Sequence, residues 1–130
     1  METSFSRQDF LFDGKTVRSI VNAGQTKNID FKITGAAGRK VNGGFLFAID
    51  AAFGDEVTCQ VCDVDNILGY GPETTLNEYL TWSIDPRGTI EIEINYAGTI
   101  PPGIYIRCIY KSCGQQDVKV AINHKLHREL

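Results

Sequence analysis

The sequence predicts an all-β protein, an antiparallel sandwich of two sheets of the jelly-roll or Greek-key type with about eight strands. Short apolar runs recur roughly every ten to fifteen residues, and Gly, Asn, Asp or Pro bound each run. That spacing is typical of antiparallel sandwiches and barrels. The chain holds 7 Phe and 5 Tyr but only 1 Met, and aromatic and branched side chains suit a pleated, half-buried surface.

The 130 residues fit one domain. No internal repeat, low-complexity segment or Ser/Pro-rich linker divides the chain. We expect residues 16–130 to form a single β-sandwich domain. Residues 1–15 are predicted to be an N-terminal arm or an edge strand.

Three strands are predicted in the first part of the chain. A weak strand is predicted over residues 16–21. Residues 28–34 alternate apolar and polar side chains, which predicts a strand with Ile29, Phe31 and Ile33 on its apolar face. Residues 43–50 are more uniformly apolar, which predicts a central strand buried on both faces. The glycine-rich segment 35–44 is interpreted as a flexible hairpin connection, with a turn signal at Asn42-Gly43.

The segment 75–85 is ambiguous, because Leu76, Tyr79, Leu80 and Ser83 recur at helical spacing. It predicts a short helix near 75–80 that leads into a strand over 81–85. A turn over 85–88 follows it.

Three alternating strands are predicted at 89–96, 103–112 and 117–126. In the first of these, Ile90, Ile92, Ile94 and Tyr96 share one face. Strict alternation of this kind indicates one buried face and one wet face. The two prolines within 98–103 exclude a central strand there, because proline lacks the N–H that a ladder needs. We interpret that segment as a loop crossing from one sheet to the other.

The stretch "CQVCDVDN" (59–66) resembles a redox pair or half of a zinc site. It continues the predicted strand "EVTCQVCDV", so side-chain alternation places Cys59 with Val57 and Val61 and turns Cys62 to the opposite face. Diverging sulfurs disfavour a shared metal. The other pair, Cys108 and Cys113, lies too far along the chain for a paired zinc knuckle. We therefore expect unreactive thiols, at least two of them packed as small hydrophobes.

The acids after these cysteines suggest a calcium loop. Asp63, Asp65 and Asn66 start like an EF-hand, but the required third oxygen ligand, glycine and distant glutamate do not follow. A sandwich loop that uses Asp65, Asn66 and Glu73 with backbone carbonyls stays open as an alternative. The favoured interpretation is that these residues form a turn by accepting local backbone N–H bonds.

Catalytic chemistry finds little support. The 2 histidines, His124 and His127, lie near the C-terminus, and His124 is expected to be a satisfied core residue on an apolar strand face. No Gly-x-Ser-x-Gly elbow occurs, and Glu91 and Glu93 are spaced along a wet strand face. The sequence thus predicts no enzyme, with no catalytic, cofactor-binding or metal-binding residue and no cofactor.

The charge pattern argues against nucleic acid as a partner. The net charge is −3, and no run of Lys and Arg follows a phosphate backbone. The N-terminus lacks the basic and apolar regions of a signal peptide, and no apolar stretch is long enough to span a bilayer. We expect synthesis in a cytoplasm, reduced thiols and no membrane contact.

Two segments, "VNGGFLFAIDAAFGDEVTCQVCDVDNILGYG" and "IPPGIYIRCIYKSCGQQDVKVAINHKLH", carry a family resemblance. The motifs are Phe53-Gly54-Asp55, Asp63-Val64-Asp65-Asn66 and the strand start over 102–107. From about Val41 onward the chain resembles small virion structural proteins of tailed bacteriophages. The resemblance implies a non-enzymatic role: capsid decoration, a cement protein on the head, or a neck or tail component. It also implies localisation in the virion, contact with major capsid or tail proteins, and a symmetric homo-oligomer, often a trimer.

Two further hypotheses stay open. Apolar residues on the N-terminal arm (Phe5, Phe10, Leu11 and Phe12) either dock on a neighbouring subunit or belong to the domain's own edge strand. The alternative function is a carbohydrate-binding β-sandwich for receptor recognition. Its stacking platforms would come from Trp82, Tyr70, Tyr79 and Tyr105.

Overall fold

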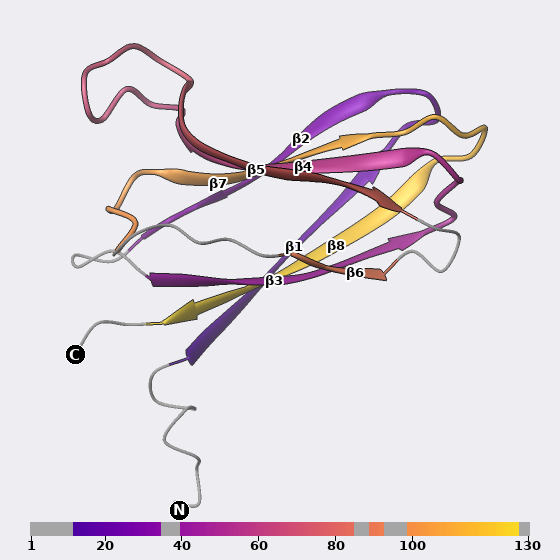
Figure 1. The fold of residues 1–130 in the computed structure, drawn as a ribbon, viewed down its shortest axis with the longest axis horizontal. Coiled ribbons are helices and arrows are strands. Elements are labelled where there is room, and N and C mark those ends of the chain that lie inside the picture. The colour runs from indigo at the N-terminus through magenta and orange to yellow at the C-terminus, as the bar shows by residue number, and fades with distance from the viewer. Residues whose placement is uncertain (1–11, 35–39, 85–88, 93–98, 128–130) are drawn as a thin grey trace, which may run out of the picture.

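The structure is a computed structural model that describes residues 12–34, 40–84, 89–92 and 99–127 (Figure 1). These residues contain eight strands and no helix. The strands are β1 (Phe12–Val21), β2 (Thr26–Lys32), β3 (Lys40–Ile49), β4 (Asp55–Asp63), β5 (Thr74–Ile84), β6 (Thr89–Ile92), β7 (Tyr105–Lys111) and β8 (Val118–His127).

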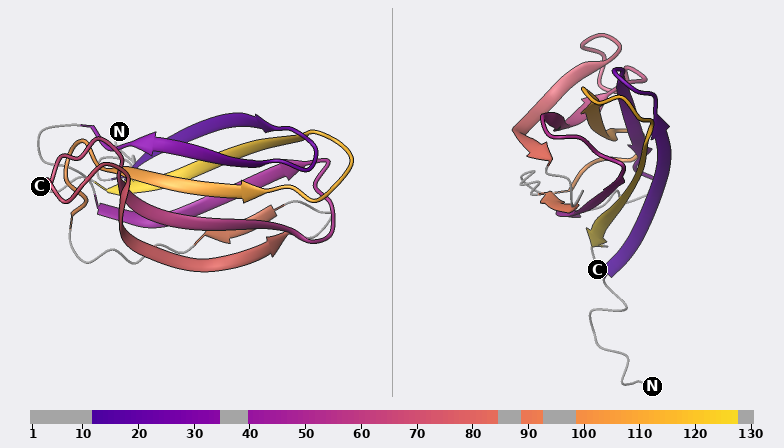
Figure 2. Two further views of the ribbon diagram at one scale, coloured as in Figure 1. Left: turned by 90° about the horizontal axis from the view of Figure 1, so that it is seen from above. Right: turned by 90° about the vertical axis from the view of Figure 1, so that its right-hand side faces the viewer.

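The strands form two four-stranded antiparallel sheets. Sheet A has the order β1-β8-β3-β6, and sheet B has the order β2-β7-β4-β5. Figure 2 shows the two layers from above and from one end. The chain crosses between the sheets after most strands, and this order is that of an eight-stranded jelly roll, which confirms the predicted fold class.

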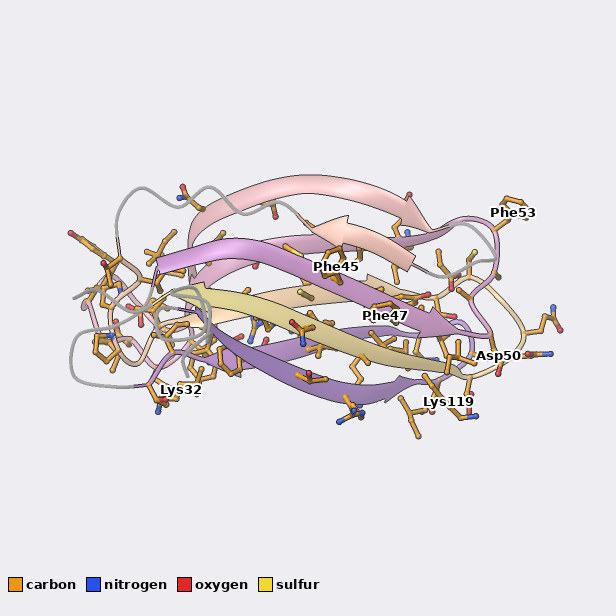
Figure 3. The ribbon with its side chains drawn as sticks, turned by 90° about the horizontal axis from the view of Figure 1, so that it is seen from below. Lys32, Phe45, Phe47, Asp50, Phe53 and Lys119 are labelled. Atoms are coloured by element: carbon orange, nitrogen blue, oxygen red, sulfur yellow. The ribbon has the colours of Figure 1, made fainter. Side chains whose placement is uncertain are left out.

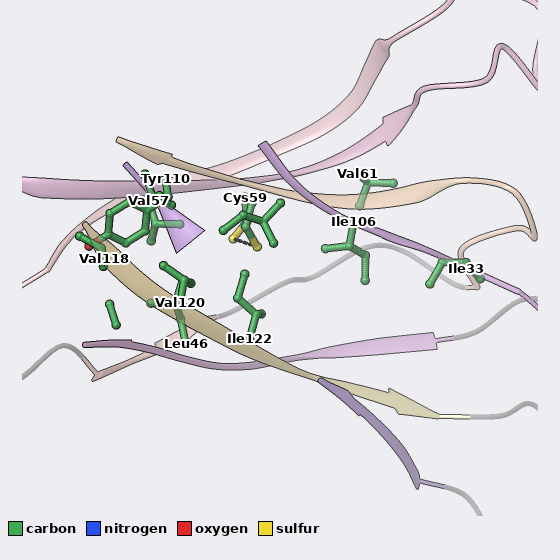
Figure 4. Close-up of a cluster of buried hydrophobic side chains, with 14 of the residues drawn as sticks. Ile33, Leu46, Val57, Cys59, Val61, Ile106, Tyr110, Val118, Val120 and Ile122 are labelled. Carbon is green, nitrogen blue, oxygen red and sulfur yellow. Dashed lines mark hydrogen bonds between the residues drawn. The ribbon is translucent and has the colours of Figure 1, made fainter. Parts of the chain in front are cut away.

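The core lies between the sheets, where alternate side chains of every central strand meet (Figure 4). Ile106, Cys108 and Tyr110 of β7 face Val120 and Ile122 of β8, and each of these side chains is at most 2% exposed. Each fully buried aliphatic side chain stabilises the fold by about 1.5–3 kcal/mol relative to exposure. This apolar layer fixes which face of each sheet points outward.

The predicted helix near 75–80 is wrong, because β5 is a strand from Thr74 to Ile84. It pairs antiparallel with β4, from Asp63↔Thr74 to Asp55↔Ile84. Helical spacing of a few apolar residues is a weak signal that tertiary pairing overrides. The β-branched residues Thr74 and Thr75 also fit the strand.

The predicted hairpin over 35–44 is also wrong. β2 lies in sheet B and β3 in sheet A, so the connection crosses between sheets, although residues 35–39 are outside the described part. The Asn42-Gly43 signal is no turn but lies inside β3, at a register shift against β8 between Val41 and Gly44. Gly43 has φ 87°, so the left-handed residue makes a β-bulge here.

Strand β3 is central in its sheet, as predicted, but it is not buried on both faces. Leu46 and Ala48 point into the core, whereas Phe47 is 46% and Ile49 is 60% exposed. The uniform apolar run therefore has one buried face and one outward face that carries apolar side chains.

Several other boundaries are refined. β1 begins at Phe12, so residues 12–15 of the predicted arm belong to the edge strand of sheet A, and residues 1–11 lie outside the described part. The described end of segment 98–103 joins β6 of sheet A to β7 of sheet B, which confirms the predicted crossing. The predicted turn over 85–88 and the second half of the strand over 89–96 lie outside the described residues.

Candidate functional site

The outer face of sheet B carries a closed polar network centred on Arg107. Its Nε and Nη2 donate to the two carboxylate oxygens of Asp30 at 2.8 and 2.9 Å, and Nη1 donates to Glu73 at 2.9 Å. The hydrogen bond to Asp30 raises the pKa of Arg107 above its ordinary value, although burial opposes this. Such a fork is among the stronger polar contacts in proteins. Arg107, Asp30 and Glu73 are all paired with one another, so we interpret the network as stabilising the fold.

Cys62 lies on this outer side, while Cys59 lies in the core, as strand alternation predicts. Burial raises the pKa of the Cys62 thiol, and the charge of Arg107 lowers it only in part. A buried thiol with a raised pKa is a poor nucleophile. The two sulfurs of the Cys-x-x-Cys motif do not share a site.

The cysteine that Cys59 meets is Cys108. The two residues are opposite each other in the β4–β7 register, and their Sγ atoms lie 3.2 Å apart in the core (Figure 4). The hydrogen bond to Cys59 and burial together raise the pKa of Cys108 well above its ordinary value. Side-chain alternation predicts that Cys59 and Cys108 each point inward. It does not predict that they meet, because a single sequence does not give the register between two distant strands.

The fourth cysteine belongs to a buried carboxylate site at one end of the sandwich. Asp55 accepts hydrogen bonds from Tyr110 Oη at 2.7 Å, from the Cys113 backbone N–H at 2.8 Å and from the Ala52 N–H at 3.2 Å. Burial alone would raise the pKa of Asp55, yet these hydrogen bonds hold it below its ordinary value. Asp55 thereby ties the β3–β4 turn to the loop after β7.

The acids of the suspected calcium loop accept hydrogen bonds from protein donors. Both oxygens of the buried Asp63 carboxylate accept backbone N–H bonds at 2.8 Å, from Ile67 and Leu68. Asn66 accepts from the Gly71 N–H at 2.9 Å. This is the turn chemistry that the sequence favours.

The remaining acids of that hypothesis point to different partners. Asp65 accepts from Tyr105 Oη at 3.1 Å and lies 3.6 Å from Lys32, whereas Glu73 is bound to Arg107. Among the residues that the structure describes, no three His, Cys, Asp or Glu side chains are arranged to hold a metal.

His124 lies in the core, as expected, but it is not satisfied by hydrogen bonds. It is 1% exposed and stacks on Phe31 of sheet B at 5.2 Å between ring centroids. Within the described part of the chain neither ring nitrogen has a hydrogen-bond partner. Burial lowers the pKa of His124 to about 4. A shielded neutral imidazole cannot reach a substrate, so it is no catalytic base.

Other residues singled out in the sequence fall outside this description. β8 ends at His127, and Glu91 lies in β6 opposite Phe45, but their side chains are not described. The same holds for the side chains of Tyr79 and Trp82, and Glu93 lies outside the described residues.

The outer face of sheet A differs from that of sheet B, because apolar side chains lie open on it. The strand register places Ile20, Lys119 and Ile49 in one row across β1, β8 and β3. Arg18, Ala121 and Phe47 form the next row. Figure 3 shows this side of the sandwich, with Phe47 on β3 and Lys119 on β8.

These two rows surround a shallow hollow of about 530 Å³. The hollow is lined by Arg18, Ser19, Ile20, Phe47, Ile49, Lys119, Val120 and Ala121. Ile20 is 53%, Phe47 46% and Ile49 60% exposed. Unlike Arg107, the cations Arg18 and Lys119 form no ion pair within the described residues. We call this apolar area with its two cations the sheet A hollow.

A second exposed apolar area lies on the β4–β5 loop. Ile67, Leu68 and Tyr70 are exposed, Tyr70 by 79%. The loop that carries them is held by the Asp63 and Asn66 hydrogen bonds, so these side chains stand on a fixed backbone.

No helix in the described residues is long and apolar enough to cross a bilayer. Comparison of the sequence with protein-family models and with curated proteins gives no match. The outer surfaces of the two sheets are therefore the main guide to function.

Proposed function

We propose that the protein is a non-enzymatic structural protein of a tailed-phage virion. In this role it decorates or cements the head, or forms part of the neck or tail, through protein–protein contacts with major capsid or tail proteins. It acts as a homo-oligomer, with a trimer as the symmetry suggested by the family resemblance.

The sheet A hollow is the observation that carries this proposal. An antiparallel sheet with one wet face ordinarily places polar side chains there, yet Ile20, Phe47 and Ile49 are about half exposed. Contiguous apolar area on a protein surface marks an interaction site. Burial of these three side chains in an interface would recover the hydrophobic free energy that the isolated chain forgoes.

The polar clusters support a structural role as well. Arg107, Asp55 and Asp63 each have their charges or oxygens engaged by protein groups. None presents an open acid, base or nucleophile. The jelly roll is also an architecture of viral capsid domains, although fold alone does not assign function.

The test is co-sedimentation of the purified protein with empty heads and with tails of the phage that encodes it. We expect saturable binding of the homo-oligomer to one of them, and at least a tenfold weaker binding for Phe47→Ser, because the loss of the largest apolar side chain of the hollow weakens the interface that holds the oligomer together. Tyr70→Ser is the matched control, because it removes an exposed aromatic side chain of similar size from the β4–β5 loop, away from the hollow. A strict monomer that binds neither particle would contradict the proposal.

The exposed Tyr70 favours one second candidate, a carbohydrate-binding module. Aromatic faces on fixed loops stack on sugar rings, and the Asp63 hydrogen bonds hold this loop in place. Tyr105, by contrast, is engaged with Asp65, and Lys32 lies over its ring. A glycan array probed with wild type and Tyr70→Ala decides this. Binding that Tyr70→Ala abolishes supports the module, and no binding to any glycan removes it.

A further inference from the structure

We propose that the sheet A hollow receives the Asp9-Phe10-Leu11 segment of a neighbouring copy of this chain. The inference rests on the proposed assembly function and names the segment that covers the apolar face. Three observations support it: the hollow itself, the two cations beside it that have no ion-pair partner among the described residues, and the covalent length of the chain.

The chemistry of the hollow defines what fits it. Ile20, Phe47 and Ile49 supply an apolar floor, and Arg18 and Lys119 add two positive charges without ion-pair partners in the described residues. A complementary segment carries large apolar side chains beside a carboxylate, because an unpaired cation that is covered without a counter-charge is costly. The hollow is also within the usual size range of binding pockets, about 300–1,000 Å³.

The chain itself contains such a segment before its first described strand. Asp9 directly precedes Phe10 and Leu11 in the sequence. These residues adjoin Phe12, the first residue of β1, which is the edge strand of the sheet that carries the hollow.

The short covalent link between Phe10 and β1 means that the segment docks on a neighbouring copy and not on its own chain. Phe10 is two residues from Phe12, a span of at most about 7 Å. The nearer row of the hollow begins at Arg18, six residues along β1 from Phe12, about 20 Å at the rise of a strand. The remaining distance of about 13 Å is too long for the side chain of Phe10 to fill the hollow of its own chain. A second copy has no such restriction.

Charge exchange in the full-length chain tests the proposal by sedimentation velocity. Asp9→Lys alone and the double variant Arg18→Glu/Lys119→Glu should each weaken self-association at least tenfold. Combining all three substitutions in one chain should restore it to within about threefold of wild type. Lys111→Glu, an exposed cation on β7 of sheet B, is the matched control and should leave self-association unchanged.

Mixing the two weakened proteins tests whether the segment acts between copies. Asp9→Lys protein and Arg18→Glu/Lys119→Glu protein carry complementary segments and hollows, so a one-to-one mixture should form mixed oligomers. Failure of the mixture to associate would overturn the inference. Phe10→Ser/Leu11→Ser is a second variant that leaves the hollow intact, and unchanged self-association in it would also overturn the inference.

The particle-binding assay separates this inference from the proposed function. If wild type binds heads or tails but its self-association does not depend on Asp9, Arg18 and Lys119, the docking of the segment in the hollow is overturned and the proposed function is not. Wild type that neither self-associates nor binds a particle overturns both.

Discussion

At the scale of single residues, His124 is the least satisfied side chain that the structure describes. Its ring is buried against Phe31 and forms no hydrogen bond there. The neutral form tolerates this position, whereas the protonated form would place a charge in the core. His124 therefore makes the fold sensitive to acid.

We predict that stability falls as the pH drops from about 6.5 to about 4. The folded-state pKa of His124 is lowered to about 4, below the ordinary value of about 6.5. In that window the unfolded chain binds a proton that the folded chain excludes. The loss is about 1.4 kcal/mol per pH unit, or about 3 kcal/mol in total.

His124→Leu should remove this dependence, as urea unfolding at pH 7, 5.5 and 4.5 would show. Asp55 does not account for this dependence. Its folded-state pKa lies below its ordinary value, so the stability that it contributes is lost at lower pH than that of His124. An equal fall in unfolding free energy for wild type and His124→Leu between pH 7 and 4.5 would contradict the role given to the imidazole.

At the scale of elements, the β4–β5 loop depends on one buried carboxylate. Asp63 accepts the N–H groups of Ile67 and Leu68. Hydrogen bonds to a charged group are worth about 1.5–3 kcal/mol. Asp63→Ala should lower the unfolding free energy by about that amount and speed amide exchange at Ile67 and Leu68.

Asp65→Ala is the matched control, because Asp65 is exposed and bonds only side chains. Hydrogen exchange followed by NMR reports each amide separately. Unchanged protection of Ile67 and Leu68 in Asp63→Ala would show that the loop holds its shape by other means.

The β4–β7 pairing brings Cys59 and Cys108 into contact. Directly opposite residues of antiparallel strands have Cα atoms about 4.5–5.5 Å apart, which is within the disulfide range. We predict that refolding with oxidised glutathione yields a Cys59–Cys108 disulfide, as two thiols lose their protons and two molecules of glutathione are released. Peptide mapping by mass spectrometry identifies the pair.

Cys62→Ser should leave this product unchanged and Cys108→Ser should abolish it. A dominant link between Cys59 and Cys62, the pair adjacent in sequence, would contradict the observed register. In the folded protein, both partners are fully buried, so the same reagent should act only after unfolding.

These elements show what the sequence could predict. Alternation alone correctly turned Cys59 inward and Cys62 outward, because side-chain direction has a period of two residues. The Cys59–Cys108 contact and the row of Ile20, Lys119 and Ile49 depend on register between distant strands, which one sequence does not encode locally. Helical spacing over 75–80 failed because pairing with β4 outweighs local preference.

At the scale of the whole molecule, long-range pairing dominates. β1 pairs with β8 along its full length, and residue partners such as Thr16 and Asn123 are more than 100 positions apart. Closing such loops costs chain entropy before the contacts stabilise the fold.

We therefore expect slow refolding, with a main phase in the millisecond-to-second range that is usual for β-sandwiches. Stopped-flow Trp82 fluorescence after dilution from urea measures it. A main phase in microseconds would mean that local structure, rather than β1–β8 closure, limits folding. Thr16→Ala, which removes an exposed hydroxyl bonded to Asn123, tests whether this pairing forms in the transition state.

The same β1–β8 pairing has a consequence for anything attached to the molecule. Phe12 and His127 are partners in the register, so polypeptides grafted before β1 and after β8 would leave from one rim, about 5 Å apart. The two grafted peptides would be neighbours. The opposite rim, where Asp55 links the β3–β4 turn to the loop after β7, would carry no grafted peptide. On a particle surface, a pair of displayed peptides would therefore share a single direction.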